Sequence, residues 1–357
     1  MKRIAVFLVL LLTVSQTSWA ARAKVTSIAR DPYVSALVID ADTGQVLFSE
    51  NPDTPVYPAS VIKLMDLLII LERISQGKNT LAEMVQVTTE AAKTGGSQVY
   101  LDPKEQFSID DLLYALTVQS ANDAAVALAI HVAGSKDGFV AMMNEKAAEL
   151  GMKNTHFYSV HGLPPSEGQK TDVTTANDLA LLSRALVSLP EALKYTNTRE
   201  RGFRDNKFIM RTHNHLLSRV EGCDGLKTGY FEAAGFSIAA TAKRGGVRVI
   251  AIVTGSKDRK VRDAKTAELL AKGFALLPPK PEAAKPETAV TGTGPAVPDK
   301  TAPAASQPAA ATVQEKEVPS SGNANWKTFL LGMAAGIFLS AVLAFFIARM
   351  RSMPRRR

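Results

Sequence analysis

The stretch YPASVIKLMDLLIILE, residues 57–72, combines a polar start with a long apolar run. Pro58 favours the first turn of a helix, so the sequence predicts a buried helix that begins near Ser60. Lys63 follows three residues later, a spacing that places both side chains on one helix face. A hydroxyl beside the unpaired N–H groups of a helix start, with an amine in reach, can be an activated nucleophile. Alone, this pair is weak evidence, because a serine cap followed by a lysine is common.

The surrounding sequence predicts helices between two groups of strands. Two β-rich runs around a turn, residues 36–48, predict an N-terminal hairpin. Three more runs joined by short turns predict an antiparallel meander over residues 225–230, 236–242 and 247–254. Apolar spacing and capping residues predict helices over residues 60–74, 108–118, 120–132, 136–150, 174–186 and 261–276. The fold class is therefore α+β, with helices packed on an antiparallel sheet.

Two more motifs combine a polar cluster with a defined backbone. Ser120-Ala121-Asn122 puts a hydroxyl and an amide directly before an apolar helix. Lys227-Thr228-Gly229 puts a cation and a hydroxyl on a strand, where glycine permits close backbone approach. Each motif alone is equally consistent with a helix cap or an exposed strand end. No glycine-rich phosphate loop or zinc-type His/Cys cluster is visible, so we expect neither a cofactor nor a metal.

With the three motifs in this order, the chain resembles the serine D-alanyl-D-alanine carboxypeptidases over nearly all of residues 31–277. These are the low-molecular-mass penicillin-binding proteins, peptidase family S11. The segments SANDAAVALA, FVAMMNEKAAELGMKNTHF, TTANDLALL and DGLKTGY also follow the family order. The resemblance implies a β-lactamase/transpeptidase-like fold with an all-helical lobe beside the sheet. It also implies removal of the terminal D-alanine from peptidoglycan stem peptides, with β-lactams as covalent inhibitors.

The resemblance assigns the catalytic steps to particular residues. Ser60 would attack the carbonyl between the two D-alanines, with Lys63 as its base. Ser120 and Lys227 would relay the proton to the leaving amine, and Lys227 would help to keep Lys63 neutral. The backbone N–H groups of Ser60 and Tyr230 would hold the oxyanion.

Substrate binding is assigned in the same way. Asn122 would hold the substrate amide, and Thr228 with Arg262 would receive the terminal carboxylate, beside Gly229 of the strand motif. His213 stands where the family often has arginine, and it is as consistent with a substrate contact as with a surface histidine. Three further positions depart from the usual threonine: Ile62, Asp66 and Phe231.

Two other functions stay open at this point. A β-lactamase would share the fold and the nucleophile, but a class A enzyme uses a glutamate to activate water. The loop of residues 161–175 offers Glu167, without the Leu-Asn that should follow it. An inactive cell-wall-binding module could keep the fold, although three intact motifs argue against it.

The two ends of the chain indicate export and membrane attachment. Residues 1–23 begin with Lys2 and Arg3, continue as an apolar stretch and end in small residues, as a signal peptide does. Residues 326–348 are long and apolar enough for a transmembrane helix, and the arginines of residues 349–357 predict a cytoplasmic tail. We expect a single-pass protein of the bacterial cytoplasmic membrane, with its catalytic domain on the periplasmic or extracellular side.

Composition and charge fit this division. Residues 24–277 can form one catalytic domain, whereas residues 278–325 are rich in Pro, Ala and Thr and predict a disordered linker. The formal net charge is +8, of which Lys2, Arg3 and the five tail arginines leave only +1 for the rest. We therefore expect no nucleic-acid partner.

Cys223 is the only cysteine, which excludes an internal disulfide and favours a small buried residue over a reactive thiol. Oligomeric state is not indicated.

Overall fold

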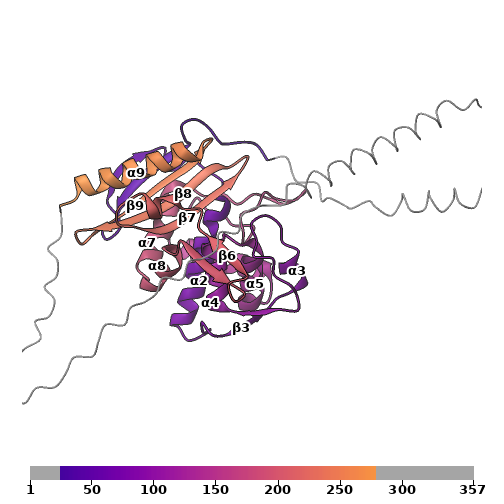
Figure 1. Ribbon diagram of the computed structural model, residues 1–357. Helices are drawn as coiled ribbons and strands as arrows, with labels where there is room; N and C mark the ends of the chain where they lie inside the picture. The colour runs from indigo at the N-terminus through magenta and orange to yellow at the C-terminus, as the bar shows by residue number, and fades with distance from the viewer. Residues whose placement is uncertain (1–24, 279–357) are drawn as a thin grey trace, which may run out of the picture. The chain divides into compact units, whose positions relative to one another are not determined.

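A computed structural model describes residues 25–278, which form a five-stranded antiparallel sheet and a group of helices (Figure 1). The strand order is β2-β1-β9-β8-β7, so the N-terminal hairpin pairs with the last strand of the meander. The principal elements, in chain order, are β1 (Ser35–Asp40), β2 (Val46–Glu50), η1 (Ala59–Ile62), α2 (Lys63–Ser75), α4 (Ile109–Thr117), α5 (Asn122–Ala133), α6 (Lys136–Glu149), α7 (Ala176–Val187), β7 (Cys223–Phe231), β8 (Gly235–Arg244), β9 (Val247–Ser256) and α9 (Arg259–Leu276).

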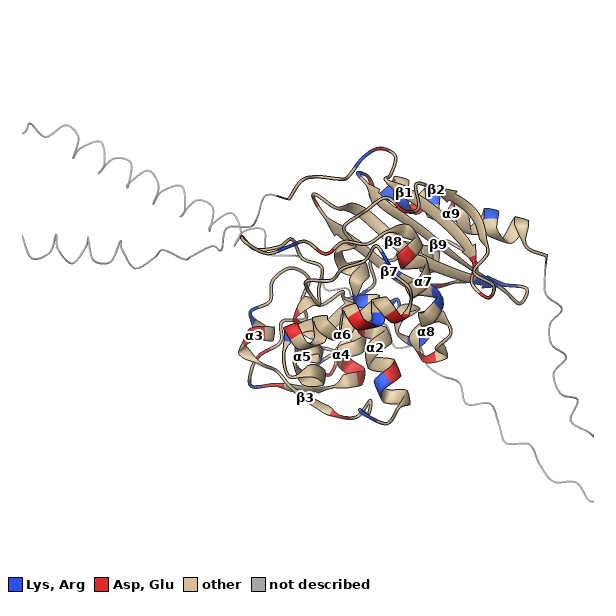
Figure 2. Cartoon of the chain, turned by 180° about the vertical axis from the view of Figure 1, so that it is seen from behind, with Lys and Arg blue, Asp and Glu red and all other residues tan. Residues whose placement is uncertain are grey.

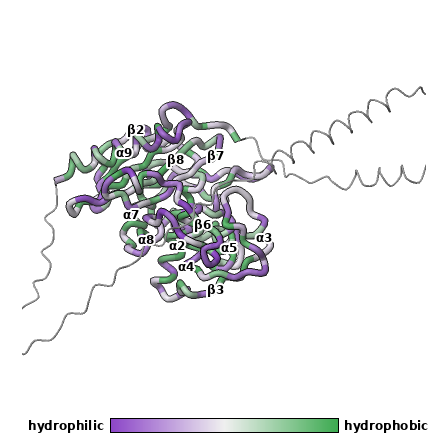
Figure 3. Tube along the Cα trace, viewed as in Figure 1, coloured by the Kyte–Doolittle hydropathy of each residue, from purple (hydrophilic) through white to green (hydrophobic). Residues whose placement is uncertain are grey.

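Alternate residues of the central strands enter two separate cores. In β9, Val249, Ala251 and Val253 belong to the core beneath α9, whereas Ile250 and Ile252 belong to the core of the helical lobe. The period of two in a strand produces this division, because successive side chains point to opposite faces. The apolar residues of β8 and β9 show as green segments in Figure 3. The sheet is therefore buried on both faces, with α9 on one side.

The helix predicted from residues 57–72 is the central helix of the lobe. Every residue of α2 from Lys63 to Leu71 is buried, as expected for a helix that is covered on all sides. Its start differs from the prediction, because Ser60 lies in the 3₁₀ turn η1 and the α-helix begins only at Lys63. The shorter repeat still places Ser60 beside the first residue of α2.

Most predicted elements are confirmed, including two predicted helix caps. The Ser108 side chain accepts the N–H of Asp111 at α4, and the Thr175 side chain accepts that of Asp178 at α7. The sequence did not predict the short elements β3 (Met84–Gln86), α3 (Thr89–Ala92), β4 (Gln106–Ser108), α8 (Pro190–Thr196), β5 (Glu200–Phe203), β6 (Phe208–Arg211) and η2 (His215–Ser218). Strands of three or four residues carry too few alternations to be recognised.

Side-chain burial and surface charge also agree with the sequence. Cys223 is buried, and burial raises the pKa of its thiol to about 11, which makes it a poor nucleophile. Figure 2 shows residues of both charges scattered over the sheet and the helical lobe, while β8 and β9 are mostly uncharged.

The predicted signal peptide, linker, transmembrane helix and tail lie outside the described residues, and those predictions stay untested. Within residues 25–278, no single helix has the length and apolar character to cross a bilayer. Helices α5 and α6, which are bent by 85° relative to each other, are long and apolar enough for a membrane span only when they are counted together.

Candidate active site

Ser60 and Lys63 lie together at the point where η1 meets α2. The Lys63 Nζ atom is 2.9 Å from the Ser60 Oγ atom. Ala59, directly before Ser60, has a φ of +47°, a conformation that non-glycine residues rarely adopt. Such strain is often found where the fold presents a reactive side chain. The backbone therefore turns sharply to present the Ser60 hydroxyl to the amine.

The surroundings of Lys63 fit a neutral amine. Its Nζ atom also contacts the Oδ1 atom of Asn122 at 2.7 Å and the carbonyl oxygen of His161 at 2.9 Å. These two oxygens can only accept, so they match the two N–H groups of a neutral amine and leave its lone pair for the Ser60 hydroxyl. Lys63 is fully buried, and burial lowers its pKa from 10.5 to about 7. The group can therefore act as a base near neutral pH.

The strand β7 approaches the Ser60 backbone through Gly229. A Cβ atom at this position would lie 2.6 Å from the carbonyl oxygen of Pro58 and 3.0 Å from the amide nitrogens of Ser60 and Val61. Any other residue would push the strand away from η1. Glycine at this point of the motif thus lets the backbone of β7 lie against the nucleophile.

Ser120 lies in the turn between α4 and α5, and Asn122 is the first residue of α5. Ser120 is buried and has a φ of +59°. Its neighbour Asn122 donates from Nδ2 to the carbonyl of Gly95 at 2.8 Å, which fixes Oδ1 toward Lys63. Ser120 lines the same cleft as Ser60, whereas the amide of Asn122 is engaged with Lys63 rather than directed into the cleft.

Lys227 lies behind the cleft wall. It is 3 % exposed, and its Nζ atom donates to the carbonyl of Thr228 at 3.0 Å. Burial, followed by the positive charges of Lys63 and Arg262, lowers the pKa of Lys227 well below its usual value. Among the described residues no hydrogen bond joins Lys227 to Ser120, so the expected relay would need a substrate or a water molecule between them.

The cleft beside these groups has a volume of about 250 Å³. Its lining residues come from η1, η2, β7, β8, α9, the α4–α5 turn and two loops, one before β4 and one before η2: Ser60, Ser97, Ser120, His213, His215, Thr228, Gly229, Tyr230, Phe236, Arg259 and Arg262. The lining is rich in hydroxyl and basic groups and contains no carboxylate. Such a cleft suits a polar, anionic ligand.

The basic residues at one end of the cleft do not all carry the same charge. Arg262 is buried and its Nε atom pairs with Asp263 at 2.9 Å, so part of its charge is already compensated. The pKa of His213 is lowered to about 4 by burial and by nearby cations, Lys227 first among them. His213 is therefore neutral at pH 7, unlike an arginine. Tyr230 is 54 % exposed at the rim and stacks on Phe236 with ring centroids 4.1 Å apart.

The loop between α3 and β4 forms another part of the cleft wall. The carbonyl of Ser97 accepts the N–H of Asn122 at 2.8 Å, and Ser97 also lines the cleft. A Cβ atom at Gly96 would lie 2.5 Å from the Nδ2 atom of Asn122. The loop therefore orients the amide that in turn contacts Lys63.

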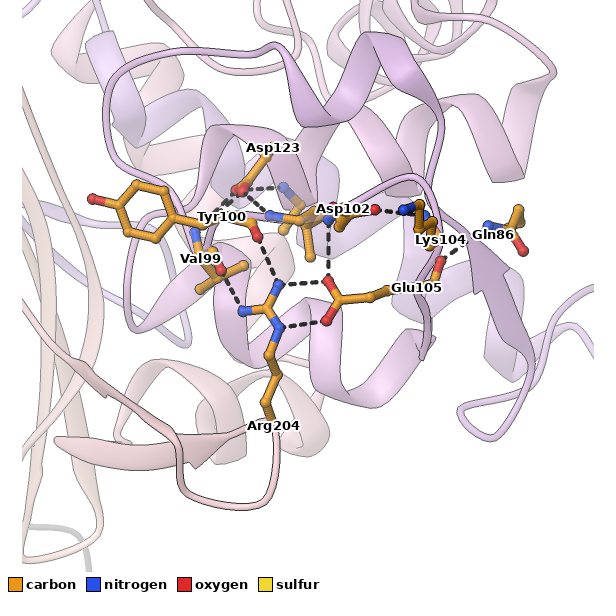
Figure 4. A network of polar contacts seen from close by, with 10 residues as sticks. Gln86, Val99, Tyr100, Asp102, Lys104, Glu105, Asp123 and Arg204 are labelled. Carbon is orange, nitrogen blue, oxygen red and sulfur yellow. Dashed lines mark hydrogen bonds and ion pairs between the residues drawn. The ribbon is translucent and has the colours of Figure 1, made fainter.

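A network of polar contacts holds this loop (Figure 4). The Asp123 carboxylate accepts the backbone N–H groups of Val99 and Leu101 at 3.1–3.2 Å. Arg204, from the turn between β5 and β6, donates to the carbonyl of Val99 and forms two 2.7 Å contacts with Glu105. The loop is thus fixed from α5 and from the β5–β6 hairpin.

Several members of the site were not predicted from the sequence. His161 contributes a backbone carbonyl, which has no side-chain signature, and burial lowers the pKa of its ring to about 3. His215 and Arg259 line the cleft only because η2 and the start of α9 pack beside β7. No group of His, Cys, Asp and Glu side chains within residues 25–278 could hold a metal ion.

The chain is similar in sequence to a family of known proteins. Residues 21–258 match the family model described as D-alanyl-D-alanine carboxypeptidase. The chain is 36% identical over 271 residues to D-alanyl-D-alanine carboxypeptidase DacF of Bacillus subtilis (strain 168), covering 75% of this chain and 69% of the relative. It is 38% identical over 259 residues to D-alanyl-D-alanine carboxypeptidase DacC of Escherichia coli (strain K12), covering 69% of this chain and 63% of the relative.

Solved structures show the same similarity. The D-alanyl-D-alanine carboxypeptidase DacD from Francisella tularensis matches with a TM-score of 0.64 and 28% identity, covering 74% of this chain and 75% of that chain. Penicillin-Binding Protein D2 from Listeria monocytogenes in its ampicillin-bound form matches with a TM-score of 0.62 and 32% identity, covering 68% of this chain and 97% of that chain. The α+β architecture is therefore that of penicillin-binding proteins.

Proposed function

Since this chain belongs to the D-alanyl-D-alanine carboxypeptidase family, we propose that it is a serine carboxypeptidase that removes the terminal D-alanine from peptidoglycan stem peptides. The observation that carries the proposal is the 2.9 Å contact between the Ser60 hydroxyl and a Lys63 amine whose pKa is about 7. A serine hydroxyl needs such a base to become a nucleophile.

Acylation proceeds from this contact. Lys63 accepts the Ser60 proton while Oγ attacks the carbonyl between the two D-alanines, and the backbone N–H groups of Ser60 and Tyr230 stabilise the oxyanion. The proton passes through Ser120, with Lys227 nearby, to the leaving D-alanine. Water then attacks the acyl group and releases the shortened peptide from Ser60.

Substrate recognition uses the hydroxyl-rich and basic end of the cleft. The terminal carboxylate binds Thr228 and Arg262, and the rim residue Tyr230 contacts the peptide. Asn122 serves the substrate amide only after its Oδ1 atom leaves Lys63, so its first role is to orient the base. β-lactams acylate the same serine, a proposal supported by the ampicillin-bound and cefotaxime-bound structures of the Listeria protein.

A β-lactamase is less well supported. Its deacylating water would need a carboxylate near the acyl group, but the cleft lining contains none and Glu167 is exposed. An inactive binding module would have no use for a buried lysine of lowered pKa, since burying an amine is costly.

We also propose that the chain is exported and attached to the cytoplasmic membrane, facing the cell wall. The support is the signal-like pattern of residues 1–23 and the apolar run of residues 326–348 followed by arginines. A membrane attachment would hold the cleft near peptidoglycan.

The test is incubation of the purified full-length chain with a pentapeptide that ends in D-alanyl-D-alanine, and separately with a β-lactam, each followed by mass spectrometry. Loss of one alanine and a long-lived adduct on Ser60 are expected, and Ser60→Ala should abolish both. Rapid turnover of the β-lactam with an intact peptide would instead establish a lactamase. No change in either substrate would leave only the binding module.

A further inference from the structure

Asp66 lies one helical turn after Lys63 and has no partner of its own. Its side chain is buried at 1 % exposure, and neither carboxyl oxygen has a hydrogen-bond partner among the described residues. An ionised carboxylate in such a place is costly unless a positive charge lies nearby. Asp66 also occupies a position where the family that the chain resembles usually has threonine, so its charge is a feature of this chain.

Two other buried carboxyls near Lys63 are different, because both are satisfied by donors. Asp123 accepts three backbone N–H groups, including that of Ala124 at 3.0 Å. Asp172 accepts the N–H groups of Tyr158 and Ser159 and the Ser159 hydroxyl, at 2.6–2.9 Å. Their negative charges are therefore held by local dipoles. Of the three carboxyls, Asp66 alone has no such donor among the described residues, so an ionised Asp66 is stabilised only when a positive charge forms nearby.

The charges around Lys63 come from several elements. The titratable groups that interact electrostatically with Lys63 are Asp66 on α2, Asp123 on α5, Asp172 and His161 in the loop before α7, His213 in the loop before η2, and Lys227 on β7. Burial lowers the pKa of Lys63, and the first of the charges that raise it is Asp66, followed by Asp123 and Asp172. Burial raises the pKa of Asp66 well above its usual value, whereas the Lys63 charge lowers it. The two groups therefore titrate as a coupled pair.

We propose that Asp66 is a positioning residue for acylation: as the buried counter-charge of Lys63, it keeps the amine basic enough to take the Ser60 proton. When the bond between Ser60 Oγ and the substrate carbonyl forms, the Oγ proton moves to Lys63, and the new ammonium lies one helical turn from the Asp66 carboxylate on α2. The pair then carries no net charge in the buried site. The inference rests on the proposed function, because it assumes that Lys63 serves Ser60.

The test compares full-length wild type with Asp66→Asn, using the rate of Ser60 acylation by a β-lactam as a function of pH. Loss of the carboxylate makes Lys63 harder to protonate, so the acidic limb of the profile should shift to lower pH by about one unit or more. The plateau rate should fall as well, because a weaker base accepts the proton less readily. Asp66→Glu, which retains the charge, should return the limb toward its wild-type position.

A matched control is Asp40→Asn, since Asp40 is a buried carboxyl on β1 that is not among the charges acting on Lys63. Its acidic limb should stay at the wild-type pH. Asp66→Asn should melt no lower than wild type, because it removes an unpartnered buried carboxyl. An unmoved limb in the folded variant, or failure of that variant to fold, would overturn the inference. A wild-type chain that is not acylated on Ser60 would overturn the proposed function instead.

Discussion

Lys63 loses its hydration when α2 packs into the helical lobe, and its pKa falls to about 7. Only the neutral amine can accept the Ser60 proton. The rate of acylation should therefore rise with pH through an apparent pKa near 7 and fall as the medium becomes more acidic. The pH profile of β-lactam acylation, measured by mass spectrometry of the adduct, checks this prediction.

His213 supplies the control for that profile. Its pKa of about 4 lies well below the expected limb, so His213→Asn should leave the limb in place whatever its effect on the rate. If His213→Asn shifts the limb, the limb does not report the titration of Lys63 alone, and the prediction is wrong. Lys63→Ala should remove the limb together with most of the acylation.

Gly229 is required because the backbone of η1 lies against it. In Gly229→Ala the new methyl group would meet the carbonyl of Pro58 at 2.6 Å and the amide of Ser60 at 3.0 Å. The strand should shift away from η1, and the N–H groups that hold the oxyanion should separate. We expect acylation to fall by roughly 100-fold or more, as for loss of an oxyanion donor.

The matched change is Gly95→Ala, in the loop between α3 and β4. Nothing lies within 4 Å of a Cβ atom there, and its φ is not in the left-handed region. That variant should acylate at a rate much closer to wild type, and both should melt as cooperative folds. If both variants lose acylation activity equally, the close approach of β7 to η1 is not the cause of the loss in Gly229→Ala.

The sequence predicts contacts between side chains that are close together in the chain. Ser60 and Lys63 are three residues apart, so their contact follows from helix geometry alone. The contacts of Lys63 with Asn122 and with the carbonyl of His161 join positions 59 and 98 residues apart. Such contacts depend on how α5 and the following loop pack on α2, which a local pattern does not record.

At the scale of elements, the β5–β6 hairpin stabilises the cleft wall from a distance. Arg204 binds Glu105 with two contacts and also donates to the loop carbonyls of Val99 and Tyr100. Arg204→Ala should destabilise the fold by about 1–2 kcal/mol, because the partly buried Glu105 carboxylate and the Val99 carbonyl lose their donor. It should also slow acylation by releasing the wall that orients Asn122.

Arg211 provides the comparison within the same hairpin. It pairs with Glu200 on the surface, where the two side chains are 68% and 56% exposed. Exposed pairs contribute about 0–1 kcal/mol, so Arg211→Ala should change neither the melting temperature nor acylation appreciably. Thermal unfolding and acylation rates, measured for Arg204→Ala and Arg211→Ala, test whether the hairpin supports the cleft wall. Similar behaviour of both would mean that the hairpin does not support the cleft.

The larger elements were predictable because their patterns are long. The hairpin, the meander and six helices all carry enough alternation or helical spacing to be recognised, and their kinds are confirmed. The pairing of β1 with β9 was not predicted, since it joins strands about 200 residues apart through the sheet order. That pairing brings the start of the domain beside its end and leaves β7 as an edge strand at the cleft.

At the scale of the whole molecule, both cores close within the described residues. The sheet packs on α9 through one face and on the helical lobe through the other, and the cleft lies where the edge strand β7 meets η1. The active groups are therefore assembled without residues 279–357. Catalysis and membrane attachment should be separable.

Deleting residues 326–357 should release an active protein from the membrane fraction. The apolar run of residues 326–348 is long enough to span a bilayer, whereas no single described helix is. Deleting only the tail, residues 349–357, should leave the protein attached, because arginines set orientation while apolar length drives insertion. Fractionation followed by β-lactam labelling measures both properties. If the longer deletion stays on the membrane, another surface of the protein binds lipid, and if it is released but unlabelled, the attached segment is needed for activity.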